Sequence, residues 1–278
     1  MLLKAYLLPH PPLAVPSVGN GMEEKIQSTV NALTNVAKEI SELSPECITI
    51  VTPHAEPLSS KFCISSGSRA SGSFSQFGAP QTRLGTEYDE PIALKIMAQA
   101  AHMGVDIGHY SSDSGVLDHG VLVPLWHINR FYTSYKIVRI AISGLGASEH
   151  YRLGMALSQA ADSLNKKTVL IASGDLSHKL SKSGPYGFDP AGPEFDRQVQ
   201  DMFIEGDFSK LFHMPESFLR KAAECGYKGL VVLAGCFDGK KIDSRVLSYE
   251  GPFGVGYAVA CVTGAGDAEK LSGGLANE

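Results

Sequence analysis

Residues Lys167–His178 read KTVLIASGDLSH, an apolar run rich in β-branched residues that passes directly into a turn of small and polar residues. A short apolar run bounded by turn residues predicts a buried strand, here over Lys167–Ala172, followed by a loop. The same arrangement occurs at Leu2–Leu8 (LLKAYLL) and at Cys47–Thr52 (CITIVT). The sequence therefore predicts three strands that each end in a loop containing a histidine.

Helical patterns alternate with these strands. Glu23–Leu43 carries apolar residues at spacings of three and four, which is typical of an amphipathic helix. Further helices are expected over Pro91–Met103, Gly120–Asn129, His150–Leu164 and Pro193–Glu205, with two more helical stretches out to Leu233. Further strands are expected over Phe62–Ser65, Lys136–Ser143, Arg245–Tyr249 and Val255–Val262. An exposed loop or irregular hairpin is expected over Ser66–Thr86. The alternation predicts an α/β fold, with a central mixed sheet flanked by helices on both faces.

A single domain is expected over residues 1–263, because no linker composition interrupts this part of the chain. Residues 264–278 read GAGDAEKLSGGLANE and are small and polar, so we expect a flexible tail or the start of a linker.

Composition excludes several classes of function. The 278 residues include 24 Lys and Arg against 29 Asp and Glu, a net charge of −5 that gives no general attraction to nucleic acid or to an anionic membrane. The N-terminus lacks a basic segment and a cleavage site, and no apolar run approaches the roughly 20 residues that span a bilayer. The five cysteines are irregularly spaced, which disfavours a disulfide framework and predicts a cytoplasmic protein.

Four of the nine histidines lie in distinctive settings. His10, His54 and His178 follow the three strands described above, and His119 immediately precedes an expected helix. Ligands of open α/β sheets bind beyond the carboxyl ends of the strands, so we expect the active site there. Prolines beside His10 and His54 would stiffen their loops. The remaining histidines have ordinary surroundings: His102, His109, His127, His150 and His213.

Two histidines and one carboxylate form a ligand set for non-haem Fe(II), and the same set binds catalytic zinc. Glu224, at a break between helices, and Glu250, at a strand end, are the candidates for the carboxylate. Cys225 is a softer alternative that would favour copper or zinc. Spacing leaves the third ligand open among these residues.

The ordered motifs PHPP (9–12), TPHAEP (52–57), LDHG (117–120) and SGDLSH (173–178) resemble those of the class III extradiol ring-cleavage dioxygenases, and the chain is similar to the catalytic subunit of protocatechuate 4,5-dioxygenase. The resemblance extends from His10 to about Tyr257. It is strongest to the branch related to Memo proteins, which is often fused to an AMMECR-type domain.

The resemblance implies a metal bound by His10, His54 and Glu224, with the cysteine of the Memo branch falling near Cys225. It also implies that His178 is the catalytic acid/base, a task that suits imidazole near neutral pH, and that His119 holds substrate or oxygen. The implied reaction is Fe(II)-dependent cleavage of a catechol-type aromatic diol by O2, and such enzymes often form homodimers.

Two other functions remain open at this stage. The Memo branch suggests a metal-binding or redox protein without catechol cleavage, and the ligand set also permits a zinc hydrolase. Asp118 and Asp175 are expected either to orient neighbouring groups or to cap turns. No Arg or Lys lies inside the four motifs, and the nearest cation that could meet a substrate carboxylate, Lys179 beside His178, could equally face solvent, so the sequence does not identify the substrate.

Overall fold

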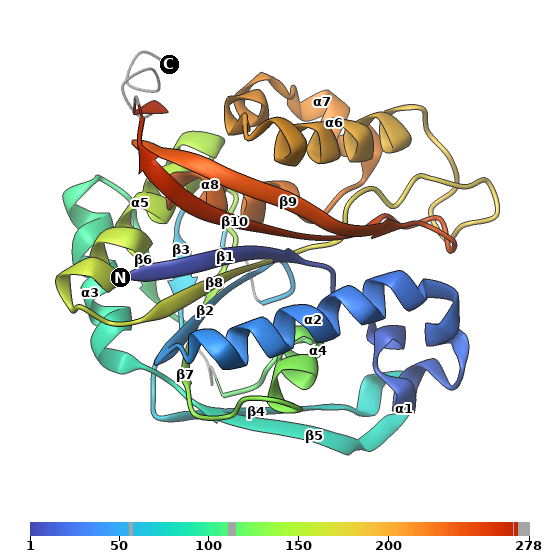
Figure 1. Cartoon of the computed structure of the whole chain (residues 1–278), viewed down its shortest axis with the longest axis horizontal. Helices are drawn as coiled ribbons and strands as arrows, with labels where there is room; N and C mark the ends of the chain where they lie inside the picture. The colour runs from blue at the N-terminus through green and yellow to red at the C-terminus, as the bar shows by residue number, and fades with distance from the viewer. Residues whose placement is uncertain (56–57, 111–114, 269, 272–278) are drawn as a thin grey trace.

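The computed structural model describes residues 1–55, 58–110, 115–268 and 270–271. Within them the chain forms one α/β domain around an eight-stranded mixed sheet of strand order β6-β3-β7-β2-β8-β1-β10-β9 (Figure 1). Its strands are β1 (Leu2–Leu8), β2 (Cys47–Thr52), β3 (Phe62–Ile64), β6 (Ile107–His109), β7 (Lys136–Ala141), β8 (Thr168–Ser173), β9 (Lys240–Glu250) and β10 (Tyr257–Asp267). The predicted fold class is confirmed.

The centre of the sheet is parallel. Strands β7, β2, β8 and β1 run side by side in one direction, with Ile50 paired to Ile171 across β2 and β8. Strands β10 and β9 then continue the sheet in antiparallel pairing beyond β1. Because β1, β2 and β8 are neighbours and parallel, the loops that follow them all leave the same edge of the sheet.

Helices cover both faces, and each face has its own hydrophobic core (Figure 1). The helices are α1 (Pro16–Gly19), α2 (Gln27–Leu43), α3 (Glu90–His102), α4 (His119–Asn129), α5 (Ala147–Ser163), α6 (Ala191–Glu205), α7 (Glu216–Ala222) and α8 (Tyr227–Gly235). Helices α3, α5, α6 and α8 bury apolar side chains in one core, and α2 and α4 do so in the other. Strands buried on both faces explain the continuous apolar runs in the sequence.

A two-stranded hairpin of β4 (Arg69–Phe74) and β5 (Ala79–Glu87) packs against α4 outside the main sheet. The hairpin lies within Ser66–Thr86 and one further residue, the segment that the sequence predicts to be an exposed loop or irregular hairpin, and its two strands are regular. Short 3-10 turns complete the chain: η1 (Pro12–Ala14), η2 (Met22–Ile26), η3 (Ser75–Phe77) and η4 (Phe208–His213).

The last two strands of the chain extend well beyond their predicted ranges. Strand β9 begins at Lys240, five residues before the expected start, and β10 continues to Asp267, five residues beyond the expected end of that strand at Val262. Gly264 pairs with Ile242 and Asp267 with Lys240, because backbone pairing does not require the large side chains by which strands are predicted. Of the remaining expected tail, residues 269 and 272–278 lie outside the described residues.

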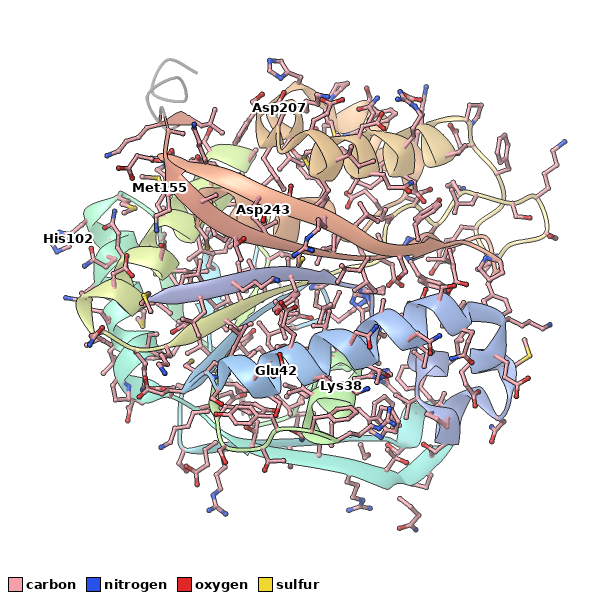
Figure 2. The ribbon with its side chains drawn as sticks, in the orientation of Figure 1. Lys38, Glu42, His102, Met155, Asp207 and Asp243 are labelled. Carbon is pink, nitrogen blue, oxygen red and sulfur yellow. The ribbon has the colours of Figure 1, made fainter. Side chains whose placement is uncertain are left out.

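Charged and polar side chains extend outward around the domain, with Lys38 and Glu42 on the outer face of α2 and His102 at the end of α3 (Figure 2). Among the described residues, no helix is both long enough and apolar enough to cross a membrane.

Candidate metal centre and active site

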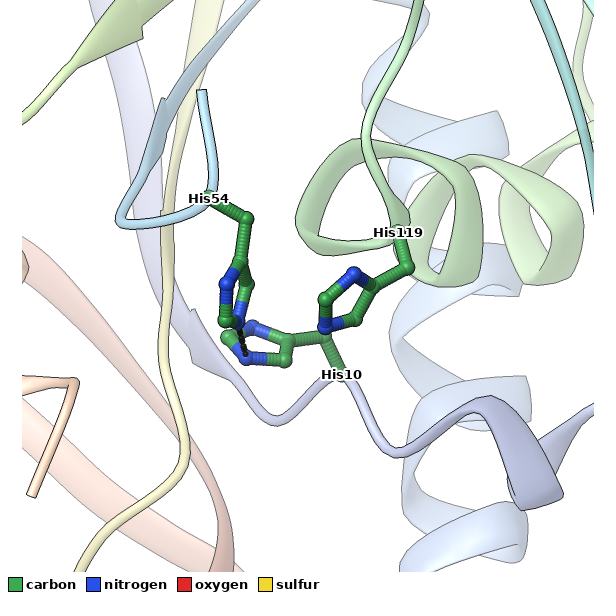
Figure 3. A group of neighbouring side chains, drawn as sticks. All are labelled: His10, His54 and His119. Atoms are coloured by element: carbon green, nitrogen blue, oxygen red, sulfur yellow. Dashed lines mark hydrogen bonds between the residues drawn. The ribbon is translucent and has the colours of Figure 1, made fainter. Parts of the chain in front are cut away.

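Three of the four distinctive histidines lie together. His10 comes from the loop after β1, His54 from the loop after β2, and His119 from the first residue of α4 (Figure 3). One ring nitrogen from each histidine lies within 4.8 Å of those of the other two. The Nε2 atoms of His10 and His54 are 2.9 Å apart, and the rings of His54 and His119 lie 3.9 Å apart between centroids.

Ser173, the last residue of β8, fixes the orientation of the His10 ring. Its Oγ lies 2.9 Å from His10 Nδ1 and donates its only proton to the carbonyl of Gly120 at 2.6 Å. A hydroxyl has a single donor, so Ser173 must accept a hydrogen bond from His10 Nδ1–H. The neutral ring of His10 then carries no proton on Nε2, and this lone pair faces the other two histidines.

Two aspartates hold the loops that carry the histidines. Asp175 Oδ1 accepts a hydrogen bond from the backbone N–H of His10 at 2.9 Å. Asp118 Oδ1 accepts from Thr52 Oγ1 at 2.8 Å, which ties the start of α4 to the end of β2. Asp118 is the N-cap residue of α4, but its side chain makes no capping hydrogen bond. These hydrogen bonds orient neighbouring loops, which is one of the two roles expected for Asp118 and Asp175.

The three rings are held in their neutral form. Burial, followed by the proximity of His54 and His178, holds the pKa of His10 well below its usual value. Burial together with His54 and His10 lowers the pKa of His119 to about 3. Desolvation also lowers the pKa of His54. A metal binds neutral imidazole, so this group is in the state that coordination requires near pH 7.

His178 lies on the loop after β8, outside the group of three. Its backbone N–H donates to the carbonyl of Ala222, and its ring stands edge-on to Tyr186 at 5.1 Å between centroids. Its Nδ1 atom is buried without a hydrogen-bond partner among the described residues. His178 is close enough to influence the pKa values of His10, His54 and Asp175.

The two carboxylates considered as third ligands are used elsewhere. Glu224 Oε2 accepts from the backbone N–H of Tyr227 at 2.6 Å, at the first residue of α8. Glu250 Oε2 accepts from both the N–H and the hydroxyl of Thr29 at 2.7 Å, in the first turn of α2. Free N–H groups at helix starts attract carboxylates. The histidine group that could hold a metal consists of His10, His54 and His119, and Glu224 as a metal ligand stays a prediction.

Cys225 lies in contact with the histidine group. Its Sγ lies 3.7 Å from His10 Nε2 and accepts a hydrogen bond from Asp175 N–H at 3.2 Å. The approach depends on glycine, because a Cβ on Gly174 would lie 2.4 Å from the Cα of Gly226. Cys225 thus remains beside the site as a soft donor.

A cavity of about 710 Å³ opens from His54 and His119 towards the β4–β5 hairpin. Its lining includes Tyr110 and the buried Arg139, neither of which has a role in the sequence-based prediction. The sequence does mark Arg139 as unusual, because it is the one charged residue within the otherwise apolar interior of KIVRIAIS (136–143). The sequence does not reveal towards which face of the sheet its side chain points.

Residues 4–260 match the family described as the catalytic LigB subunit of aromatic ring-opening dioxygenase. The chain belongs to this family. It is 40% identical over 261 residues to protein CA_C1420 of Clostridium acetobutylicum. It is also 27% identical over 188 residues, or 63% of the chain, to a Rhodococcus jostii protein named 2,3-dihydroxyphenylpropionate/2,3-dihydroxicinnamic acid 1,2-dioxygenase, and 25% identical over 201 residues, or 67%, to a Rhodococcus protein of the same name.

The chain spans only part of these relatives. The matched region is 91% of this chain but only 56% of the clostridial protein, 54% of the Rhodococcus jostii protein and 59% of the other Rhodococcus protein. Among solved structures, an uncharacterised Escherichia coli K12 protein, JW3007, shares the fold with a TM-score of 0.59 at 15% identity, over 94% of this chain and all of that one.

Ring-opening dioxygenases of the LigB family use a non-haem metal, and the histidine group fits such an ion. Three neutral imidazoles within 4.8 Å of one another form a donor set that suits iron, zinc, copper or nickel. The hydrogen bond from His10 Nδ1 to Ser173 is the outer contact that metal-binding histidines usually make. The donor set does not distinguish among these metals.

Proposed function

We propose that the protein is an Fe(II)-dependent extradiol dioxygenase that cleaves catechol-type aromatic diols. The reaction inserts both atoms of O2 and breaks the ring C–C bond beside the two hydroxyl-bearing carbons, so it needs no external reductant. The observation that supports it is the group of His10, His54 and His119, of which His54 and His119 line a polar cavity, in a chain of the LigB family.

His10 and His54 would hold the metal in this proposal, with His119 as the third donor. When bound, ferrous iron supplies the redox chemistry that lets an aromatic diol react with O2. Ser173 and Asp175 keep the His10 ring and backbone in place, and the bond between Asp118 and Thr52 does the same for the other two loops. Rigid support of this kind is needed because small displacements at a metal site reduce both affinity and rate.

His178 would move the protons. Cleavage requires a base to take a proton from the diol and an acid to return it to the ring-opened product, and imidazole performs both tasks near neutral pH. The loop that carries His178 is fixed from two sides. The N–H of Ser177 donates to Asp196 Oδ1 at 2.8 Å, and the hydroxyl of Ser177 donates to the carbonyl of Ala222.

A second candidate function is a Memo-like metal-binding or redox protein without ring cleavage. The contact between Cys225 Sγ and His10 Nε2 favours it, because a thiolate in place of His119 would give a softer site suited to copper or zinc. Replacing Cys225 by Ser and His119 by Gln in separate variants distinguishes the donors, since the true third ligand is the one whose loss lowers metal affinity. Loss of affinity in the cysteine variant alone would contradict the three-histidine site.

The test of the main proposal is anaerobic loading with Fe(II), followed by catechols and air. The expected result is O2 consumption and a yellow ring-opened product, both abolished in His178→Gln while metal content is retained. If the protein binds Fe(II) but consumes no O2 with any of the catechols, this result would contradict the dioxygenase and favour the Memo-like protein.

The wider setting is also proposed. The clostridial relative extends well beyond the matched region, which supports an association with a further domain, expected from the sequence to be of the AMMECR type. We propose that the protein is a cytoplasmic homodimer that acts on a small aromatic diol and O2. Size-exclusion chromatography with light scattering would test whether it is a dimer.

A further inference from the structure

We propose that the β4–β5 hairpin positions the metal ligand His119, with Phe77 as the residue that sets the orientation of the His119 ring. The inference rests on the proposed function in one respect, because it takes His119 as a donor to the metal. It adds a positioning residue at the metal centre and gives a task to a hairpin that lies outside the main sheet.

The ring of His119 is held by packing. Metal-binding histidines usually donate their second ring N–H to a neighbouring acceptor, as His10 does to Ser173. Among the described residues, the ring nitrogens of His119 have no such partner. Its ring instead contacts those of His54, His10 and Phe77, at 3.9, 5.3 and 5.4 Å between centroids. Two of these rings belong to the metal site itself, so Phe77 is the contact that can hold His119 from outside.

Phe77 meets His119 in the geometry that aromatic rings favour. The planes of the two rings are 75° apart, so the edge of one ring faces the π-surface of the other. A pair of this kind shifts an equilibrium between ring orientations by about 2–13-fold. Phe77 is not among the described residues that line the cavity beside His119. Its influence on the site therefore passes through His119.

The turn of the hairpin places Phe77. Phe77 ends η3, and Gly78 follows it with a φ of 82°, a left-handed conformation that glycine adopts without strain. Phe74, at the end of β4, is fully buried, and its ring centroid lies 6.4 Å from that of Phe77. The buried ring of Phe74 thus anchors the turn, from which Phe77 reaches His119.

Strand β4 fixes the backbone in front of His119. Ser71 donates its N–H to the carbonyl of Gly115 at 2.7 Å, and its own carbonyl accepts from the N–H of Leu117 at 3.0 Å. This close approach requires Gly72, because a Cβ there would lie 2.8 Å from the carbonyl oxygen of Leu117. The hairpin therefore holds both the chain two residues before His119 and the His119 ring.

The second strand of the hairpin is also anchored. The hydroxyls of Ser17 and Thr82 share a hydrogen bond of 2.7 Å, which joins β5 to α1 (Figure 1). With both strands fixed, the hairpin is a rigid support for the ring that it contacts. Metal ligands need such support, because small displacements at a metal site lower affinity. Loss of the Phe77 ring should therefore weaken metal binding although no donor is removed.

A double-mutant cycle on Zn²⁺ affinity tests the inference. Competition with a chelator gives the affinity of the parent protein, Phe77→Leu, His119→Gln and the double variant. We expect Phe77→Leu to lower the affinity about 2–13-fold in the parent background. It should have no effect in the His119→Gln background, because its route to the metal is through His119. Equal loss in both backgrounds would mean a purely structural role and would overturn the inference.

Phe74→Leu is the matched control, because it removes a more deeply buried ring from the same hairpin. It should destabilise the metal-free protein in urea at least as much as Phe77→Leu does, and yet keep the Zn²⁺ affinity of the parent. The visible absorption of bound Co²⁺ reports the number and geometry of its ligands. It should change in Phe77→Leu alone, and an unchanged spectrum there would overturn the inference. If Phe77→Leu fails to fold, Phe77→Met carries the same comparison.

The outcome is separable from that of the proposed function, because the cycle needs neither a catechol nor O2. The expected cycle in a protein that cleaves no catechol would retain the positioning role and reject the dioxygenase. Ring cleavage by a protein whose Zn²⁺ affinity is unchanged in Phe77→Leu would retain the dioxygenase and reject the positioning role.

Discussion

Replacing Ser173 by Ala tests how the site is assembled. The hydroxyl of Ser173 accepts from His10 Nδ1 at 2.9 Å and donates to the Gly120 carbonyl at 2.6 Å, so one atom links β8, the His10 loop and α4. Without it, nothing holds the proton of His10 on Nδ1, and Nε2 is no longer kept free for a metal. We expect the substitution to weaken metal binding rather than to abolish folding.

The magnitude follows from the two bonds. Loss of an outer contact to a metal-binding histidine typically costs about 10–100-fold in metal affinity, or about 1.4–2.7 kcal/mol. The metal-free protein should also lose about 1–3 kcal/mol of unfolding free energy, because a buried carbonyl and a buried ring nitrogen lose their partner.

Competition with a chelator of known affinity, for Fe(II) under anaerobic conditions and for Zn²⁺, measures the first effect, and urea unfolding of the metal-free protein measures the second. Ser248→Ala is the matched control, because the Ser248 hydroxyl is buried on β9 without a partner among the described residues. Equal metal affinity in the Ser173 and Ser248 variants would refute this account of the His10 ring.

Three further predictions follow from the loops around the site. Burial raises the pKa of Asp196 to about 7, so its contribution to stability is full below about pH 4 and is lost as the pH rises to about 7. Asp196→Asn should therefore remove up to about 4 kcal/mol of pH dependence across this window in urea unfolding, and an unchanged profile would contradict the shift. His178→Gln should lower kcat at least about 100-fold with little change in metal affinity, whereas unchanged turnover would exclude it as the acid/base. Gly174→Ala should destabilise the fold by at least about 2 kcal/mol, because the new Cβ would meet Gly226 Cα at 2.4 Å; a thermal shift within error of the parent would show that the loops can separate.

The convergence of His10 and His54 could be predicted from sequence. Each follows an apolar run, and parallel neighbouring strands bring such loops to one edge. The sequence also placed His119 at the start of a helix, but its contact with the other two rings depends on how α4 packs against β2. That packing is set by tertiary contacts, including the Asp118–Thr52 bond, which local patterns do not encode.

The sequence left the third donor open for a similar reason. Glu224 and Glu250 both lie near ends of elements, as a metal ligand often does, but the same position allows a carboxylate to bind the N–H groups at a helix start. Arg139 was missed because its direction depends on the register of β7 in the sheet.

Isotope labelling tests the central claim most directly. The protein, loaded anaerobically with Fe(II), is mixed with a catechol and ¹⁸O2, and the product is analysed by mass spectrometry beside that of His10→Ala. The account predicts a ring-opened product with ¹⁸O in its new carboxylate, formed by the parent protein and absent in the variant. A parent protein that retains Fe(II) and binds the catechol yet forms no labelled product would contradict it.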